Sequence, residues 1–284
     1  RTAMIDRPRF RELHLSEIDE DGPEGYDLVQ LKMDGIWGCM VIRDCKYVIY
    51  SRTGKAKQIG ALPHDRWDST KETILLGEFM KGSHWGHKMD IDGDFYAFDC
   101  IKYNDVDIKN EPYHVRLDIM SVVVNKQFPE NFVKPLPTVN SNLWTNLWYN
   151  EVIDQAYEGL VFKRSDAGYY DKHAWARLES VVEIEYMCIG MEPADPESKY
   201  AGLAGAVIGS LVDKPLAVKC GGLSEDMRDE FTNYPERYVG QVFTAKGNGW
   251  YPSGTIRHPK FKCWRDDKEV DECTYDQIPE LIRE

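Results

Sequence analysis

The chain lacks several features that would each decide its class. It has no run of eighteen apolar residues and no apolar segment typical of a secretory signal near its start, so we expect neither a membrane span nor export. Its seven cysteines are scattered and none forms a Cys-x-x-Cys pair, which disfavours structural zinc and favours reduced thiols in the cytoplasm. No glycine lies five residues before Gly54-Lys55, so this pair is not part of a P-loop.

Positive charge is also scarce, with 35 basic against 48 acidic residues and a net charge of −13. The parts before and after Cys188 are both acidic. Nucleic-acid binding depends largely on lysine and arginine neutralising phosphates. Net charge is a sum over all faces, however, and a basic groove can lie on an acidic body. We therefore expect modest nucleic-acid affinity with a steep salt dependence.

The hydrophobic pattern predicts two kinds of structure along the 284 residues. The first part alternates strands with helical stretches. The predicted strands are 26–31, 38–42, 47–50, 74–80, 95–101 and 159–163, and the predicted helices are 116–125 and 142–157. After a strand at 182–191, short strands at 206–211, 216–219 and 238–245 are separated by glycine and proline. Such strands suit a small closed barrel, for which the OB-fold is the natural choice.

The run Lys32-Met33-Asp34-Gly35 is the most informative stretch for chemistry. A lysine amine has a pKa of about 10.4, so it is protonated at neutral pH and cannot attack phosphorus. Nearby cations, a metal ion or desolvation must lower this pKa before the amine becomes a nucleophile. The glycine lets backbone approach a ligand closely. Taken alone, such a tetrapeptide also occurs by chance in surface turns.

Five further motifs follow in a fixed order. They are Ser51-Arg52-Thr53-Gly54, Leu76-Gly77-Glu78-Phe79, Phe95-Tyr96-Ala97-Phe98-Asp99, Glu158-Gly159-Leu160-Val161-Phe162-Lys163 and the segment Arg257–Lys268. The ordered set resembles the covalent nucleotidyltransferase superfamily, and most closely the ATP-dependent DNA ligases of minimal viral or bacterial type. The last motif, Arg-His-Pro-x-Phe followed by Arg-x-Asp-Lys, is more similar to a DNA ligase than to a capping enzyme.

The resemblance implies an α+β fold. Residues 1–187 would form a nucleotidyltransferase (adenylation) domain of antiparallel sheets with flanking helices, and residues 188–284 a C-terminal OB-fold β-barrel. The segment 192–206, where some minimal ligases extend a DNA-encircling latch, is short, so we expect incomplete encirclement of the duplex.

The resemblance also implies roles for the residues around the nucleophile. Lys32 would attack the α-phosphorus of ATP and carry AMP, with Asp34 in the same catalytic motif. Lys163 would touch the α-phosphate and help to depress the pKa of Lys32. Gln30 would read the adenine edge, and Arg52 would hold the ribose or the nick phosphate. The ordinary readings are a solvent-facing strand residue for Gln30 and a turn arginine for Arg52.

Three more residues complete the predicted nucleotide site. Glu78 would accept hydrogen bonds from the ribose hydroxyls, and Phe98 would stack on adenine. Glu158 would help to hold Mg²⁺, a hard ion that prefers oxygen ligands, with Mn²⁺ able to substitute. Phe98 could equally be a core aromatic, and Glu158 a helix-end acid before a glycine.

The C-terminal motif implies why a second domain is needed. Arg257, Arg265 and Lys268 would swing over the triphosphate and orient the departing pyrophosphate, with Asp267 orienting the cations. A plainer interpretation is a DNA-phosphate patch on the barrel.

Two places depart from the family pattern. Trp37 stands where the family usually has an arginine, so one phosphate or ribose contact is missing or supplied elsewhere. Arg177 and Glu179 stand where Lys-x-Lys is common. Arg177 replaces lysine as a cation but not as a proton donor or acceptor, and Glu179 reverses the charge at the second position. The alternatives are that either Lys172 or Lys163 compensates, that the motif aligns in another register, or that catalysis is slower than in the family.

The predicted function is an ATP-dependent DNA ligase that seals nicks in three steps through a lysyl-AMP intermediate. Its partners would be ATP and nicked double-stranded DNA, without a membrane, and it would be a monomer in the cytoplasm (of the host, if viral). The alternatives are an RNA ligase or capping-type guanylyltransferase, and a non-catalytic nucleic-acid-binding module whose catalytic set has decayed.

Overall fold

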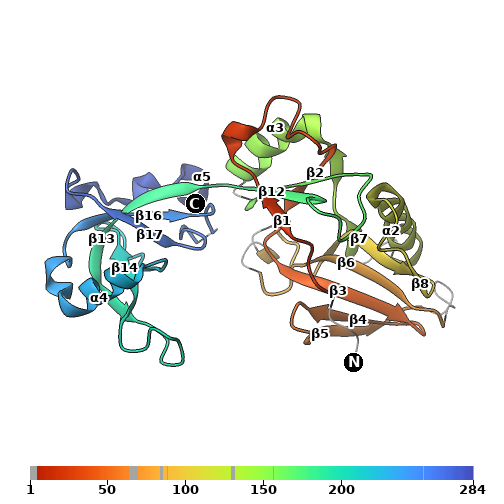
Figure 1. Ribbon diagram of the computed structural model, residues 1–284, viewed down its shortest axis with the longest axis horizontal. Coiled ribbons are helices and arrows are strands. Elements are labelled where there is room, and N and C mark those ends of the chain that lie inside the picture. The colour runs from red at the N-terminus through yellow and green to blue at the C-terminus, as the bar shows by residue number, and fades with distance from the viewer. Residues whose placement is uncertain are drawn as a thin grey trace. The chain divides into compact units, whose positions relative to one another are not determined.

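The computed structural model describes residues 5–63, 70–83, 86–87, 89–128, 132–155, 157–251 and 253–283. The chain forms two compact units (Figure 1), the first comprising Arg1–Ile153 and Tyr157–Leu178, and the second Asp154–Ala156 and Glu179–Glu284. The boundary predicted after Met187 would instead fall inside strand β13 (Val182–Pro193), all of which lies in the second unit.

The first unit contains a large, mainly antiparallel sheet with the order β5-β4-β3-β6-β7-β8, to which β9 adds in parallel beside β7. Its strands are β3 (Ile36–Arg43), β4 (Lys46–Ser51), β5 (Ala56–Ala61), β6 (Thr73–Phe79), β7 (Phe95–Tyr103), β8 (Val106–Asp107) and β9 (Val133–Pro135). Leu76 pairs with Asp99 and Gly77 with Ala97, so Phe98 is the extra residue of a β-bulge.

Helix α2 (Tyr113–Gln127) covers one face of this sheet, where Figure 1 shows it beside β7 and β8. It begins after Pro112, whose fixed φ suits a helix start. Met120 and Val124 on the helix pack into a buried cluster with Met40, Leu75 and Phe95 from the strands. The predicted helix at 116–125 is thus confirmed.

The helical stretch predicted at 142–157 is helical from Ser141 to Ile153, and it is made of three consecutive pieces. They are the 3₁₀ turn η2 (Ser141–Leu143), α3 (Trp144–Leu147) and the π-helical turn η3 (Trp148–Ile153). The indole of Trp144 donates to the carbonyl of Asp19 at 2.9 Å, and the wide turn buries both Trp148 and Val152. Burial of these side chains overrides the regular helical period.

A second, smaller sheet in the first unit has the order β1-β12-β11-β2-β10. Its strands are β1 (Phe10–Glu12), β2 (Leu28–Lys32), β10 (Thr138–Asn140), β11 (Gly159–Lys163) and β12 (Trp175–Glu179). In its register Lys32 lies opposite Gly159, and Gln30 lies between Val161 and Thr138. Because alternate residues share a face and opposite residues point the same way, Gln30, Lys32 and Lys163 lie on one face.

The second unit is a five-stranded antiparallel sheet with the order β15-β14-β13-β16-β17. Besides β13, its strands are β14 (Ala204–Ser210), β15 (Val218–Cys220), β16 (Val242–Gly247) and β17 (Lys260–Trp264). The two edges meet where Gly221 bridges to Lys260 in parallel, which closes the sheet into a barrel. The predicted α+β class with a C-terminal OB-fold barrel is confirmed.

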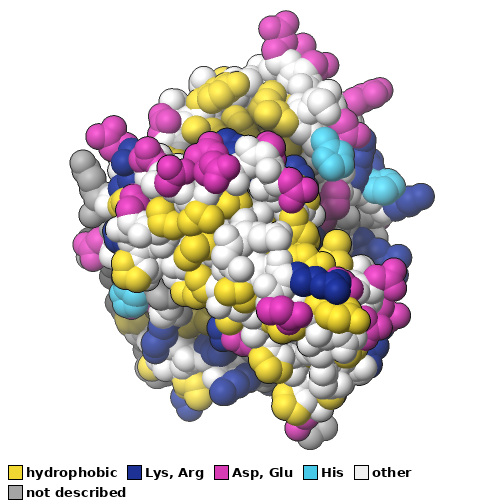
Figure 2. All heavy atoms as spheres, turned by 90° about the vertical axis from the view of Figure 1, so that its left-hand side faces the viewer, with side chains coloured by type: hydrophobic (Ala, Val, Ile, Leu, Met, Phe, Trp, Pro, Cys, Tyr) yellow, Lys and Arg dark blue, Asp and Glu magenta, His cyan; other side chains and the backbone are white. Residues whose placement is uncertain are grey.

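Helix α4 (Glu225–Asn233) lies on this barrel, and the Ser224 hydroxyl caps it by accepting from the amide of Met227. Phe231 on the helix packs edge-to-face on Phe261 and Trp264. Figure 2 shows acidic side chains at many places on the face it draws, and fewer basic ones, in keeping with the net charge of −13. None of the helices among the described residues has the length and apolar character needed to cross a bilayer.

Candidate nucleotide-binding site

The predicted nucleophile, Lys32, ends β2 with its amine in an ion pair. Its Nζ lies 2.5 Å from Oε1 of Glu158, and the two side chains are 20% and 6% exposed. Antiparallel pairing of β2 with β11 produces this contact, because it sets Gly159 opposite Lys32 and brings Glu158 beside it. Lys32 is therefore mostly buried, and its amine is paired with a carboxylate that is more deeply buried than the amine itself.

Gly35, in the turn after Lys32, accommodates no side chain. A Cβ built there would lie 2.7 Å from the carbonyl oxygen of Phe79. This closeness lets the Gly35 amide donate to Oε1 of Glu78 at 3.0 Å. Burial raises the pKa of Glu78 to about 7, although the charges of Lys32 and Arg7 and the Gly35 hydrogen bond oppose the shift. The Ser83 hydroxyl donates to the carbonyl of Asp34 at 2.8 Å and anchors the same turn.

Lys163, at the end of β11, lies in an aromatic pocket and is 1% exposed. Its amine lies 4.0 Å from the ring centroid of Trp175, 4.6 Å from that of Tyr113 and 4.7 Å from that of Phe98. It also donates to the Tyr113 hydroxyl at 3.2 Å. Burial lowers the pKa of Lys163 to about 7, against the opposing charge of Asp99. The amine therefore changes its protonation near neutral pH.

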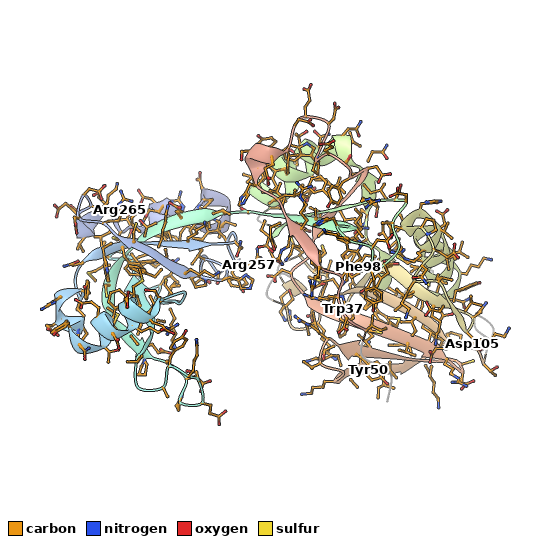
Figure 3. All side chains as sticks on the ribbon, in the orientation of Figure 1. Trp37, Tyr50, Phe98, Asp105, Arg257 and Arg265 are labelled. Carbon is orange, nitrogen blue, oxygen red and sulfur yellow. The ribbon has the colours of Figure 1, made fainter. Side chains whose placement is uncertain are left out.

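Phe98, labelled in Figure 3, lies at the bulge of β7 and contacts the small sheet. Its ring packs edge-to-face on Trp175 with centroids 5.5 Å apart. Behind it, the fully buried pair of Asp99 and Arg116 joins β7 to α2 through two bonds of 2.9 and 3.0 Å. Such a bidentate pair fixes the strand that carries Phe98.

Gln30, buried between its neighbours, makes two side-chain hydrogen bonds. Its Nε2 donates to the Tyr113 hydroxyl at 3.0 Å and to the Thr138 hydroxyl at 2.7 Å. The interpretation of Gln30 as a solvent-facing strand residue is wrong, because it is only 1% exposed.

Arg7 is a cation that the motifs did not indicate. Its Cζ lies 5.8 Å from the ring centroid of Trp37 (labelled in Figure 3), within the range of a cation–π contact. Burial lowers the pKa of Arg7; the charge of Glu78 opposes this shift, whereas Arg52 and Arg177 add to it. These electrostatic interactions place a positive charge from the N-terminal segment beside the position where the family arginine is absent.

Four further residues named by the motifs are exposed or half-buried, and one of them, Glu179, is the first residue of the second unit after Leu178. Arg52 is exposed in the turn after β4. Arg177 lies opposite Glu12 in the parallel pairing of β1 and β12, and its Nε donates to Oε1 of Glu12 at 2.5 Å. Glu179 ends β12, and Lys172 is exposed in the preceding loop. Of the two proposed compensating lysines, only Lys163 is enclosed with Gln30 and Phe98.

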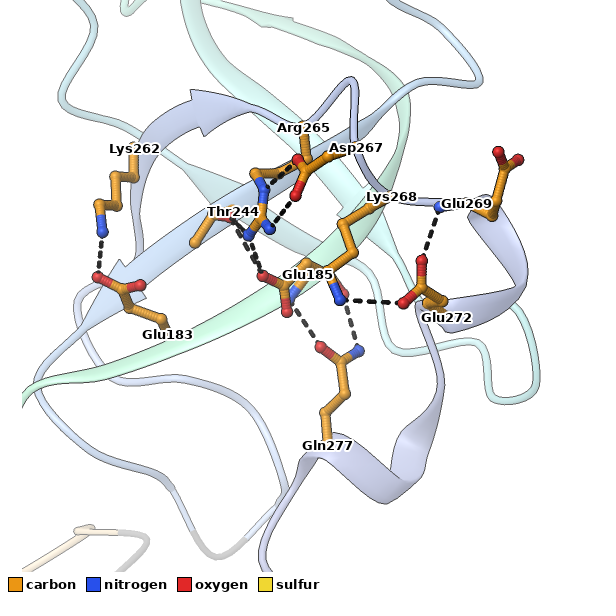
Figure 4. A network of polar contacts seen from close by, with 10 residues as sticks. All are labelled: Glu183, Glu185, Thr244, Lys262, Arg265, Asp267, Lys268, Glu269, Glu272 and Gln277. Atoms are coloured by element: carbon orange, nitrogen blue, oxygen red, sulfur yellow. Dashed lines mark hydrogen bonds and ion pairs between the residues drawn. The ribbon is translucent and has the colours of Figure 1, made fainter.

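The C-terminal motif forms a closed polar network within the second unit (Figure 4). Arg265 donates from Nε and Nη2 to the Asp267 carboxylate at 2.8 and 2.7 Å, and from Nη1 to Glu185 at 2.8 Å. The hydrogen bonds from Arg265 lower the pKa of Asp267 to about 2. Lys268 donates to Glu272 at 2.9 Å.

Arg257, from the same motif, is fully buried, with Cζ 5.0 Å from the ring centroid of Tyr251. Its Nη1 lies 3.5 Å from the carbonyl oxygen of Asn248. The movement of this motif over a triphosphate stays a prediction.

The side chains of the described residues offer few ligands for a metal. No group of three or more histidine, cysteine, aspartate or glutamate side chains is arranged to hold an ion in the ranges that the structure covers. Glu158 fits an ion that takes most of its ligands from phosphates and water, which is how Mg²⁺ usually binds beside a nucleotide.

The two units define a fold in which a domain of two sheets is followed by an OB-fold barrel. Residues 67–178 match the family model described as "ATP dependent DNA ligase domain". This part of the chain is therefore similar to ATP-dependent DNA ligase domains. No curated protein matches the sequence.

Solved structures share the fold at low sequence identity. One, described as "DNA binding with a minimal scaffold: Structure-function analysis of Lig E DNA ligases", has 16% identity and a TM-score of 0.65 over 92% of this chain and 100% of that chain. "Pmar-Lig_Pre." has 20% identity and a TM-score of 0.64 over 86% of this chain. "Pmar-Lig_PreS3" has 18% identity and a TM-score of 0.63 over 85%. The present chain spans 64% of the length of each Pmar-Lig chain.

Proposed function

We propose that the chain is an ATP-dependent DNA ligase that seals 3′-hydroxyl/5′-phosphate nicks in duplex DNA. The observation that carries the proposal is the gathering of Lys32, Gln30 and Lys163 on one face of the small sheet, with Phe98 packed over it. This arrangement supplies a nucleophile, a base-reading amide, a phosphate-binding cation and a stacking ring. The match to the ligase domain covers residues 67–178, which include Phe98 and Lys163.

In the first step the unprotonated Nζ of Lys32 attacks the α-phosphorus of ATP. A nitrogen–phosphorus bond forms, the bond to pyrophosphate breaks, and AMP stays on the lysine. Before attack Lys32 leaves Glu158, and the carboxylate of Glu158 would then help to hold Mg²⁺ or Mn²⁺. When bound, the ion neutralises charge on the phosphates.

Lys163 would hold the α-phosphate during this step. Its pKa of about 7 is depressed by burial, and a phosphate beside it would favour the charged form again. A fixed cation in a dry pocket stabilises the developing negative charge without reorganisation. The Gly35 amide donates to Oε1 of Glu78, so the other carboxylate oxygen, Oε2, would accept a hydrogen bond from a ribose hydroxyl.

In the second and third steps AMP passes to the 5′-phosphate of the nick, and the 3′-hydroxyl displaces it. Arg52, exposed beside the site, would contact the ribose or this phosphate. Arg177 would add positive charge at its rim, while Arg257, Arg265, Asp267 and Lys268 would assist pyrophosphate departure. We expect a monomer in the cytoplasm.

The test is intact-mass measurement after incubation with ATP and Mg²⁺, followed by sealing of nicked duplexes. We expect one added adenylate on the parent, none on Lys32→Ala, and sealing of nicked DNA. A parent without any adduct would instead support a binding module. If the adduct formed from GTP, the result would support a capping-type enzyme. If the adenylylated protein sealed only nicked RNA, the result would support an RNA ligase.

A further inference from the structure

The neighbours of Gln30 determine which end of its amide faces them. Its nitrogen and oxygen have nearly the same shape, so the hydrogen-bond network decides the orientation. Two hydroxyls contact the amide, those of Tyr113 at 3.0 Å and Thr138 at 2.7 Å. Each hydroxyl has a single proton to donate.

Both of these protons are committed elsewhere. The Tyr113 hydroxyl donates to the carbonyl of Phe98 at 2.6 Å, and the Thr138 hydroxyl donates to the carbonyl of Leu136 at 3.1 Å. A carbonyl oxygen only accepts, so neither proton can turn back towards Gln30. Both hydroxyls must therefore accept from Gln30, and the atom between them must be Nε2.

Lys163 reinforces this arrangement at Tyr113. Its amine donates to the same hydroxyl at 3.2 Å, so Tyr113 accepts twice and donates once. Its oxygen is then fully used. Tyr113 is 1% exposed, so water does not compete for these bonds.

The consequence concerns the other end of the amide. The two N–H groups of Gln30 go to Tyr113 and Thr138, which leaves Oε1 as the group available to a ligand. Oε1 is only an acceptor. At position 6, adenine presents an amino donor and guanine presents a carbonyl acceptor. The amide held in this way attracts the first base and repels the second.

We propose that Tyr113 and Thr138 are positioning residues that orient the Gln30 amide and so select ATP over GTP. The inference rests on the proposed function, because it takes the face shared by Gln30 and Lys32 as the nucleotide side. Neither hydroxyl touches the base; each acts through Gln30. The competing explanation is that the three side chains only satisfy one another in the interior, which would affect both nucleotides equally.

The clearest variant is Thr138→Val, which keeps the shape, removes one acceptor from Gln30 and also removes the hydroxyl that donates to the Leu136 carbonyl. Tyr113→Phe removes the other acceptor and also a Lys163 contact, so it should lower the overall rate as well. The matched control is Tyr169→Phe, since Tyr169 is fully buried in the same unit and its hydroxyl donates to Asp6 instead. Thermal unfolding of each variant checks that it folds.

The measurement is the ratio of kcat/KM for lysyl-nucleotide formation from ATP and from GTP. We expect this ratio to fall about tenfold in Thr138→Val and in Tyr113→Phe, the size of one hydrogen bond, and to stay unchanged in Tyr169→Phe. A uniform loss with both nucleotides and a constant ratio would overturn the inference.

Equilibrium binding of ATP and GTP to the parent and Thr138→Val, without Mg²⁺, gives the same ratio independently of adduct formation. If the parent bound ATP more tightly than GTP but formed no adduct, the ligase proposal would be refuted. The inference about base selection would then be judged by whether Thr138→Val lowers the ratio of the ATP and GTP affinities. A parent that binds both nucleotides equally would refute the inference.

Discussion

Arg7 lies over the indole of Trp37, with its Cζ 5.8 Å from the ring centroid. Trp37 stands where the family pattern described above usually has an arginine. The N-terminal segment therefore brings a positive charge beside β3 at this position.

We expect Arg7→Ala to raise the KM for ATP in lysyl-adenylate formation about tenfold, because it removes one charge-assisted contact to the nucleotide. Initial rates over a range of ATP concentrations measure the effect. Arg9→Ala, an exposed neighbour in the same segment, is the control. Equal KM values for Arg7→Ala and the parent would show that Trp37 functions without this cation.

The buried amine of Lys163 should make stability depend on pH in a defined direction. Its folded pKa of about 7 lies below the ordinary value of 10.5, so between these values the unfolded chain binds more protons and the free energy of unfolding rises with pH. Lys163→Met removes this dependence. Its stability relative to the parent should therefore be greatest below pH 7 and decline as pH rises to 10.5.

Thermal unfolding of both proteins from pH 6 to pH 10 measures this difference. Lys172→Met, at an exposed lysine in the loop after β11, should show no such trend. A Lys163→Met difference that stays constant with pH would argue against a depressed pKa.

Glu78→Ala should weaken discrimination between ATP and 2′-deoxy-ATP about tenfold, because the variant loses the oxygen that accepts from the ribose. Lysyl-nucleotide formation from the two nucleotides gives the ratio. Glu72→Ala, just before the opposite end of β6, tests for general effects on the strand. If the ratio survives in Glu78→Ala, the carboxylate does not contact the 2′-hydroxyl.

Asp99→Asn should destabilise the protein by about 3–5 kcal/mol, because it leaves the fully buried Arg116 without its counter-charge. Denaturant unfolding measures this cost. The exposed pair of Asp107 and Lys109 provides the comparison, and Asp107→Asn should cost about 1 kcal/mol or less. Similar costs at the two sites would mean that the buried pair is readily replaced by uncharged contacts.

Arg265→Ala should slow lysyl-adenylate formation more than it slows sealing of a nick that already carries AMP. The reason is that its proposed role concerns pyrophosphate departure, which only the first step involves. Offering ATP with a plain nick, and then a pre-adenylylated nick, separates the steps. Arg237→Ala, on the same unit and outside the motif, is the control. Equal losses of rate in both assays would indicate that Arg265 contacts DNA and does not act in pyrophosphate departure.

Much of the fold followed from local pattern. The helix at 116–125 and the strands around Lys32, Glu78 and Lys163 could be predicted because apolar residues recur within each of them at helical or strand spacing. The stretch 142–157 is helical as predicted up to Ile153, but the apolar pattern did not indicate its division into 3₁₀, α and π turns.

The sequence predicted only those residues of the candidate site that belong to a recognisable motif. Gln30, Lys32 and Glu158 lie in or beside recognised motifs. Tyr113 and Thr138 do not, and they reach Gln30 from 83 and 108 residues away in the chain. Such contacts depend on sheet register and on how α2 meets the strands, which the hydrophobic pattern does not specify.

The space around Gly35 sets a limit on how this protein can vary. Any residue with a Cβ would push against the carbonyl of Phe79 and pull the turn after Lys32 away from Glu78. In a saturation library selected for nick sealing, we expect position 35 to return to glycine alone, while the exposed Lys172 accepts many replacements. The backbone of a neighbouring strand thus limits which residues this protein can have at position 35, independently of any chemical role of the turn.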